Sequence, residues 1–336
     1  MAHKRLSYIE LVEQMLSGNM VSLARLVSLI EGGSSEASHI MKLVYPHTGK
    51  AYRVGLTGPP GLGKSTIVDK LTAVARSQGL EVGIIAVDPT SPFSGGAVLG
   101  DRIRMQQHYL DEGVFIRSMA TRGSLGGLPR TVNEVINLID ASGKDIILLE
   151  TVGVGQSELD IIKNVDTVVV VLAPESGDNI QTMKAGLLEI ADIFVINKAD
   201  RPGADDLINE LQAMLQLHSE QAQWEIPILA TEAVNNVGIE ELYQQIQLHR
   251  ESLSGTGLLT QRRQQQRREQ FINSLEKKIS VELFEIIKQD GQLNRYIGEV
   301  EKGEIDPYTA VDEILNSKAF ITTLSRRLSQ RRQPGG

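Results

Sequence analysis

This sequence of 336 residues lacks cysteine, long apolar runs and any excess of positive charge. Without cysteine, disulfides, zinc–thiolate sites, iron–sulfur clusters and thiol catalysis are excluded. The longest apolar run, Val168–Ala173, is far shorter than the ~20 residues that a membrane-spanning helix needs. The formal net charge is -8 at pH 7. We therefore expect no membrane partner and no nucleic-acid partner.

The amino-terminal residues also lack the apolar stretch of a secretion signal, and Glu10 and Glu13 argue against a transit peptide. A cytoplasmic location is therefore expected. The hydrophobic fraction is 41% and the charged fraction is 23%, as in globular proteins that bury a core. This composition excludes disorder as the main state of the chain.

The pattern of apolar residues divides the chain into three regions. Residues 1–50 have helical periodicity and predict a helical extension, and residues 257–336 are helical again. Between them, residues 51–250 alternate short β-rich runs with helical stretches, which predicts an α/β domain with a mostly parallel sheet flanked by helices. The expected strands are Tyr52–Thr57, Val82–Val87, Val114–Ser118, Asp145–Glu150, Thr167–Ala173, Ile193–Asn197 and Ile226–Ala230.

An apolar stripe runs along the helical region after residue 257, where little else is available for it to bury against. It consists of Phe271, Leu275, Ile279 and Leu283. Exposed stripes of this kind usually mark an interface, so we expect a two-fold homodimer. Packing of the stripe onto the chain's own α/β domain is the alternative.

Residues Gly58–Ser65 fit the pattern G-x-x-x-x-G-K-[ST] between an expected strand and an expected helix. Glycines let successive backbone N–H groups surround phosphate oxygens, and the following helix N-terminus favours negative charge. Lys64 is expected to reach the β- and γ-phosphates from an exposed position in the pocket, and Ser65 to bind Mg²⁺. The expected nucleotide-binding residues here are Gly58, Pro59, Pro60, Gly61, Leu62, Gly63, Lys64, Ser65 and Thr66.

A second motif, Asn197-Lys198-Ala199-Asp200, closes an expected strand and predicts guanine selectivity. The Asp200 carboxylate can accept hydrogen bonds from both N1–H and N2–H of guanine. Adenine would leave this buried carboxylate unpaired, so the motif favours GTP over ATP. The segment Glu232-Ala233-Val234 follows the last expected strand, where a backbone N–H could meet guanine O6.

An apolar strand ends at Glu150, which we expect to act at the Mg²⁺ shell, directly or through water. Gly153 follows three residues later and can offer its N–H to the γ-phosphate. A helix N-cap acid is the alternative interpretation of Glu150. Asp88 and Asp101 flank a Gly/Pro/Ser-rich connection and could join the metal site or serve as turn residues.

Taken together, these segments resemble the MeaB/ArgK/MMAA-type P-loop GTPases over nearly the whole chain. The most specific matches are Ala86–Met105 and Glu150–Glu158, and Gly303–Tyr308 is similar to the family's C-terminal region. The resemblance implies a GTPase that chaperones an adenosylcobalamin-dependent acyl-CoA mutase, usually methylmalonyl-CoA mutase. Such proteins gate cofactor loading and protect the mutase from inactivation.

The resemblance also implies a homodimer that uses C-terminal helices, with N-terminal helices packed on the GTPase core. It assigns Asp88, Asp101 and Glu150 to the Mg²⁺ and switch machinery. It makes Gly177–Lys184 a third switch that responds to the mutase, with Lys184 in the coupling.

The catalytic water lacks an obvious positioning group, because Val154 follows Gly153 where Ras-like enzymes carry glutamine. Gln156 is a candidate that would need a conformational change. Glu232 also departs from the family, which frequently has serine in the guanine loop. If only the following backbone N–H is used, little is lost.

The sequence thus predicts a Mg²⁺-dependent GTPase that cycles between GTP and GDP and acts on a mutase. One alternative is a nickel-insertion GTPase, but those proteins need Cys/His motifs and this chain has no cysteine. Another is a kinase-like or transport-associated phosphotransfer ATPase. The sequence shows no separate domain that would bind a phosphate acceptor, which argues against this alternative.

Overall fold

The computed structural model describes residues 6–88, 106–121, 128–151, 160–174, 186–218, 224–289 and 291–330. The chain forms two compact units, Met1–Gln264 and Gln265–Gly336. The expected boundaries at residues 50, 250 and 257 stay predictions.

The first unit is built on a seven-stranded sheet in the order β3-β2-β4-β1-β5-β6-β7, and its paired strands are parallel. The strands are β1 Tyr52–Thr57, β2 Val82–Asp88, β3 Val114–Ala120, β4 Ile146–Glu150, β5 Thr167–Leu172, β6 Ile193–Asn197 and β7 Ile228–Thr231. Each lies within a residue or two of the range expected from the sequence. The predicted α/β class with a mostly parallel sheet is therefore confirmed.

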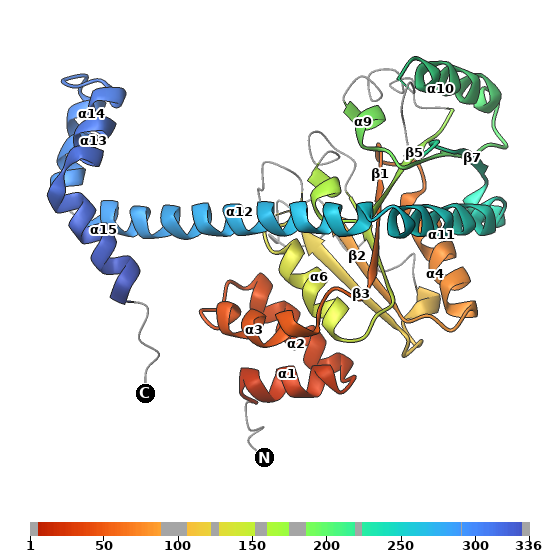
Figure 1. The fold of residues 1–336 in the computed structure, drawn as a ribbon, viewed down its shortest axis with the longest axis horizontal. Helices are drawn as coiled ribbons and strands as arrows, with labels where there is room; N and C mark the ends of the chain where they lie inside the picture. The colour runs from red at the N-terminus through yellow and green to blue at the C-terminus, as the bar shows by residue number, and fades with distance from the viewer. Residues whose placement is uncertain are drawn as a thin grey trace. The chain divides into compact units, whose positions relative to one another are not determined.

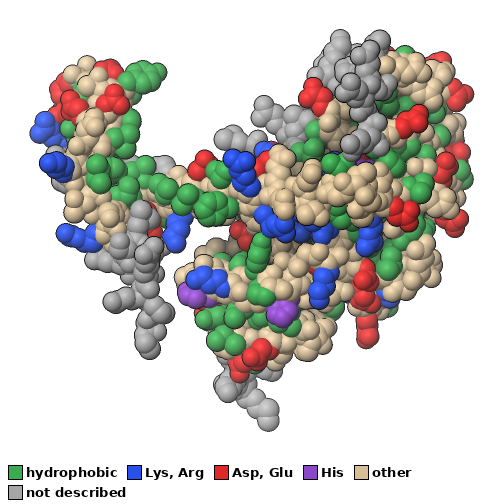
Figure 2. Space-filling view, in the orientation of Figure 1, with side chains coloured by type: hydrophobic (Ala, Val, Ile, Leu, Met, Phe, Trp, Pro, Cys, Tyr) green, Lys and Arg blue, Asp and Glu red, His purple; other side chains and the backbone are tan. Residues whose placement is uncertain are grey.

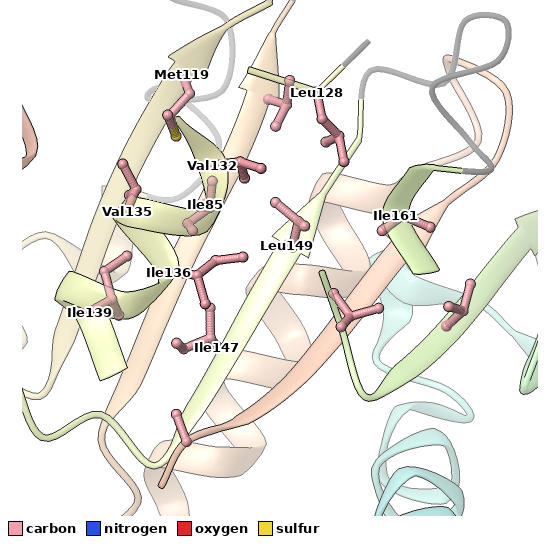
Figure 3. Close-up of a cluster of buried hydrophobic side chains, with 14 of the residues drawn as sticks. Ile85, Met119, Leu128, Val132, Val135, Ile136, Ile139, Ile147, Leu149 and Ile161 are labelled. Carbon is pink, nitrogen blue, oxygen red and sulfur yellow. The ribbon is translucent and has the colours of Figure 1, made fainter. Parts of the chain in front are cut away.

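Helices cover both faces of this sheet, and each face has its own apolar core (Figure 1). On one face lie α4 (Lys64–Ser77) and α11 (Ile239–Gly255). On the other lies α6 (Val132–Ala141), where Ile136 and Ile139 point toward Ile85 and Ile147 of the sheet (Figure 3). Strands buried on both faces explain the continuous Val/Ile runs in the sequence.

The N-terminal helices extend the core on the α6 face. They are α1 Tyr8–Leu16, α2 Met20–Glu31 and α3 Ala37–Val44. A capping box starts α1, in which the Glu10 N–H donates to Ser7 Oγ at 3.3 Å and the Ser7 N–H donates to Glu10 Oε2 at 2.7 Å. Apolar side chains of all these helices, such as Met15, Leu26 and Ile40, are fully buried.

The remaining elements of the first unit lie before, between and after the strands. They are η1 Tyr45–His47, η2 Gln106–His108, η3 Ile161–Lys163, α9 Leu188–Ile190, α10 Ala204–His218 and η5 Ala233–Asn235. None of the described helices is long and apolar enough to cross a membrane.

The second unit contains most of α12 (Leu258–Gln289) together with α13 (Gly291–Glu301), α14 (Pro307–Asn316) and α15 (Lys318–Gln330). Its small core joins Phe320 to Leu283, Ile314 and Leu324. The four residues of the predicted apolar stripe therefore have two different environments. Leu283 packs inside this unit, whereas Phe271, Leu275 and Ile279 are 66%, 48% and 39% exposed. Figure 2 shows further apolar side chains at the surface of these C-terminal helices.

Candidate functional site

A cavity of about 670 Å³ opens at the carboxyl edge of the sheet. Residues of the loop between β1 and α4 line it, together with residues at the ends of β2, β4 and β6 and in the loop after β7. Parallel α/β sheets place their ligand sites at this edge, and the volume suits a small ligand. The two sequence motifs, separated by over a hundred residues, thus meet at one cavity.

The phosphate loop, Gly58–Ser65, needs glycine at two positions for steric reasons. Gly58 has φ +131°, and a Cβ there would lie 2.1 Å from the Val171 carbonyl oxygen. Gly63 has φ +88°, and a Cβ there would lie 2.4 Å from Asn197 Nδ2. Larger residues would push the loop away from β5 and β6. Helix α4 then starts at Lys64, with its N-terminus at the cavity.

Lys64 lines the cavity, but its side chain is only 4% exposed and is packed against its own loop, which the sequence reasoning did not expect. Its Nζ donates to the carbonyl oxygens of Gly58 at 2.6 Å and Pro59 at 2.9 Å. The loop curls around the ammonium group, and its carbonyls replace water as hydrogen-bond partners. Lys64 is thereby held beside the loop that is predicted to carry phosphate.

Three buried oxygen donors line the same cavity. The Ser65 hydroxyl donates to Glu150 Oε1 at 2.7 Å, and Asp88 stands at the end of β2. A hydroxyl with carboxylates is a donor set that suits Mg²⁺, which keeps waters and phosphate oxygens as its other ligands. Across the described residues, no group of three or more His, Asp or Glu gathers as a metal site. The Ser65 hydroxyl and the carboxylates of Asp88 and Glu150 would supply part of the ligand set of a bound Mg²⁺ ion.

Asn197 connects the separate parts of the site through its side-chain amide. Its Nδ2 donates to the Leu62 carbonyl at 2.7 Å, and its Oδ1 accepts from Thr231 Oγ1 and the Ala233 N–H, both at 3.1 Å. The side chain is buried. Asn197 thus ties the phosphate loop to β6 and to the loop after β7.

The other residues predicted to read the base stand at the open side of the cavity. Lys198 has a left-handed backbone with φ +59°, which is rare for a residue with a side chain. Asp200 is exposed at the cavity wall, where a bound base would cover it. Glu232 is half-buried, and Val234 is 82% exposed.

Several cavity residues were missed by the sequence reasoning. They are Val87, Thr151, Arg201 and Asn235. Each is adjacent to a predicted residue, which was the only signal available. Of the predicted site residues, Asp101, Gly153, Gln156 and Lys184 lie outside the described residues.

Comparison with known proteins identifies the family of the chain. Residues 23–287 match the family described as methylmalonyl Co-A mutase-associated GTPase MeaB. A provisionally named GTPase of Pyrococcus abyssi is 52% identical over 309 residues, which cover 91% of this chain and 95% of that protein. The GTPase ArgK of Escherichia coli is 31% identical over 322 residues, or 94% of this chain and 96% of its own.

A mouse protein named as the mitochondrial methylmalonic aciduria type A homolog is 32% identical over 328 residues. The match covers 91% of this chain and 78% of the mouse protein. Among solved structures, a LAO/AO transport system kinase superposes with a TM-score of 0.68 and 27% identity, covering 93% of this chain and 98% of that one. The chain therefore belongs to the MeaB family, and it is a GTPase.

Proposed function

We propose that this GTPase is a nucleotide-dependent chaperone of an adenosylcobalamin-dependent acyl-CoA mutase, methylmalonyl-CoA mutase in the first instance. The observation that carries the proposal is the match of residues 23–287 to a family described by its association with that mutase. The chaperone gates cofactor loading and protects the mutase from inactivation. Its site of action is the cytoplasm.

The phosphate loop binds the phosphates of GTP in this proposal. Backbone N–H groups of Gly61–Thr66 and the N-terminus of α4 face the phosphate oxygens, and Lys64 pairs with the β- and γ-phosphates. Ser65, Asp88, Asp101 and Glu150 hold Mg²⁺. When bound, the ion neutralises charge that develops between the β- and γ-phosphates.

The guanine base is selected by Asp200, which accepts from N1–H and N2–H. Guanine O6 meets an N–H of the Glu232–Val234 loop. The Ala233 N–H already donates to Asn197 Oδ1, so the Val234 N–H is the alternative donor. Asn197 and Lys198 hold the strand end in the shape that presents Asp200.

Hydrolysis is slow without the partner, because the residue after Gly153 is Val154 and cannot orient the attacking water. Gln156 takes that role after a rearrangement, with Gly153 at the γ-phosphate. Lys184 belongs to the segment that responds to the mutase. We expect the cognate mutase to raise kcat at least about tenfold, which is roughly 1.4 kcal/mol of barrier.

The protein acts as a homodimer in this proposal. Phe271, Leu275 and Ile279 supply the interface, since they lie on one side of α12 and are exposed.

Single-turnover hydrolysis of γ-labelled GTP, with and without purified methylmalonyl-CoA mutase, tests the proposal. We expect free phosphate, slow basal turnover and stimulation by the mutase. The Lys184→Ala variant should keep basal turnover and lose much of the stimulation. Absence of stimulation and of binding by this mutase and by other acyl-CoA mutases would overturn the proposal. Label on a protein instead of free phosphate would favour a kinase.

A further inference from the structure

Two buried threonines face each other across the strands that carry the site. Thr57 is the last residue of β1 and directly precedes Gly58, and Thr151 directly follows Glu150, the last residue of β4. The Thr151 hydroxyl donates to Thr57 Oγ1 at 3.0 Å, and the exposed fractions of the two residues are 1% and 0%.

The contact continues the pairing of the two strands beyond their last ladder residues. Leu56 of β1 is in register with Glu150 of β4, and the Thr151 N–H donates to the Leu56 carbonyl at 3.1 Å. Thr57 and Thr151 are the next two residues that stand opposite each other in this register. The hydroxyl bond therefore joins the starting point of the phosphate loop to the residue after the predicted metal-binding acid.

The other end of the phosphate loop is attached to the same short segment. The Ser65 hydroxyl donates to Glu150 Oε1 at 2.7 Å. Consecutive residues, Glu150 and Thr151, thus hold Ser65 and Thr57, and the loop between them is closed into a ring by two side-chain hydrogen bonds. On the opposite side of β1, Gly58 lies against the Val171 carbonyl.

Packing alone does not explain threonine at these positions. Valine has nearly the same shape and would bury no hydroxyl group, and burial of an unpaired hydroxyl is unfavourable. Each hydroxyl is paired only because the other residue also carries a hydroxyl group, and Thr151 also lines the nucleotide cavity. A paired hydroxyl at the base of a phosphate site serves to fix distances between the groups around the reacting phosphate.

We propose that Thr57 and Thr151 are positioning residues for GTP hydrolysis. Their hydrogen bond sets the position of the phosphate loop relative to Glu150 and leaves nucleotide contacts to other residues. Loss of the bond therefore lowers kcat more than it raises KM, because small displacements matter most in the transition state.

The test compares Thr57→Val, Thr151→Val and the double variant by steady-state GTP hydrolysis, which gives kcat and KM, at a temperature where each is folded. We expect each valine to lower kcat roughly tenfold with KM changed less than about twofold. The double variant should be no slower than either single variant, because both remove the same bond. Serine at either position should restore most of the rate.

Thr72→Val is the matched control. Thr72 is as buried as Thr57, and its hydroxyl donates to the Val68 carbonyl within α4, away from the cavity lining. This variant should lose stability without losing kcat. Wild-type kcat in the valine variants, or losses that multiply in the double variant, would overturn the proposal. If a valine variant does not fold, Thr57→Ala and Thr151→Ala are judged by the same kcat criterion.

Discussion

Arg262 of α12 forms a two-pronged ion pair with Asp192, the residue before β6, with N–O distances of 2.9 and 3.0 Å. Next to it, Arg263 pairs with Asp166, the residue before β5, at 2.9 and 2.6 Å. Both aspartates also accept backbone N–H groups, from Val168 and from Arg53. The first turns of α12 are thereby attached to the amino edge of the sheet, opposite the nucleotide cavity.

Breaking the Arg262–Asp192 pair should destabilise the first unit. In Arg262→Met, the Asp192 carboxylate, whose side chain is 11% exposed, loses its charged partner and keeps its bond to the Val168 N–H. We expect a loss of roughly 2–3 kcal/mol in the free energy of unfolding. Chemical denaturation followed by Trp224 fluorescence measures it, since Trp224 is the single tryptophan and donates to the Asp192 carbonyl at 2.8 Å.

Arg295→Met is the control for that measurement. Arg295 pairs with Glu299 within α13, on an exposed surface of the second unit, so its loss should leave the unfolding of the first unit unchanged. An Arg262→Met protein as stable as wild type would contradict the structural role of the pair.

His249 should make stability depend on pH. It is 1% exposed, and burial lowers its pKa, as does Arg262, while Asp192 at 3.3 Å and Asp166 oppose the shift. A neutral buried histidine binds fewer protons folded than unfolded, so its contribution is complete above the unfolded pKa of about 6.5 and is lost as pH falls below it. The slope due to this one group is at most about 1.4 kcal/mol per pH unit.

Unfolding free energies between pH 7 and pH 5 check this expectation. The His249→Gln variant should lose part of the pH dependence, whereas His47→Gln, at an exposed position, should keep it. Identical pH profiles for wild type and His249→Gln would refute the assignment.

Removal of the phosphate-loop lysine should abolish catalysis without unfolding the chain. In Lys64→Ala, the carbonyls of Gly58 and Pro59 lose an ammonium donor, and the space left by the side chain adjoins the cavity that Lys64 lines, from which water can enter. We expect kcat or GTP affinity to fall by roughly 100-fold or more. Lys70→Ala, two turns further along α4, is the control and should behave as wild type. If GTP binding and turnover were unchanged in Lys64→Ala, the assignment of Gly58–Ser65 as the phosphate site would be wrong.

Base selection should change in Asp200→Asn. The carboxylate accepts from guanine, whereas the amide can donate to the C2 carbonyl of xanthine. The ratio of kcat/KM for GTP over xanthosine triphosphate should fall roughly 100-fold or more. Asp206→Asn, at an exposed position on α10, serves as the control. A preference that stays with guanine in Asp200→Asn would show that another group reads the base.

Dimerisation should depend on the exposed face of α12. The full-length double variant Phe271→Glu/Leu275→Glu places charge on that face and should sediment as a monomer, since buried unpaired charge is strongly unfavourable. Asn273→Glu, on the opposite side of the same helix, should leave the sedimentation unchanged. A double variant that remains dimeric would assign the interface elsewhere.

Local sequence determined the strands of the sheet and the two motifs at its carboxyl edge. The Val/Ile runs such as Thr167–Leu172 predict strands covered on both faces, and the structure has them there. Gly58–Ser65 and Asn197–Asp200 could be found because each motif is continuous in the chain. Parallel strands then bring their carboxyl ends to one edge without further information.

Contacts between distant residues were decided only by the tertiary structure. Asn197 reaches Leu62 across 135 residues, Arg263 reaches Asp166 across 97, and Thr151 reaches Thr57 across 94. The first and third contacts depend on the order of strands in the sheet, 4-1-5-6, and the second depends on where α12 packs against the sheet. The periodicity of the sequence indicates which face of a helix or strand is buried. It does not indicate which residues pack against that face, because these depend on the order of the strands, which is set only when the whole sheet has assembled.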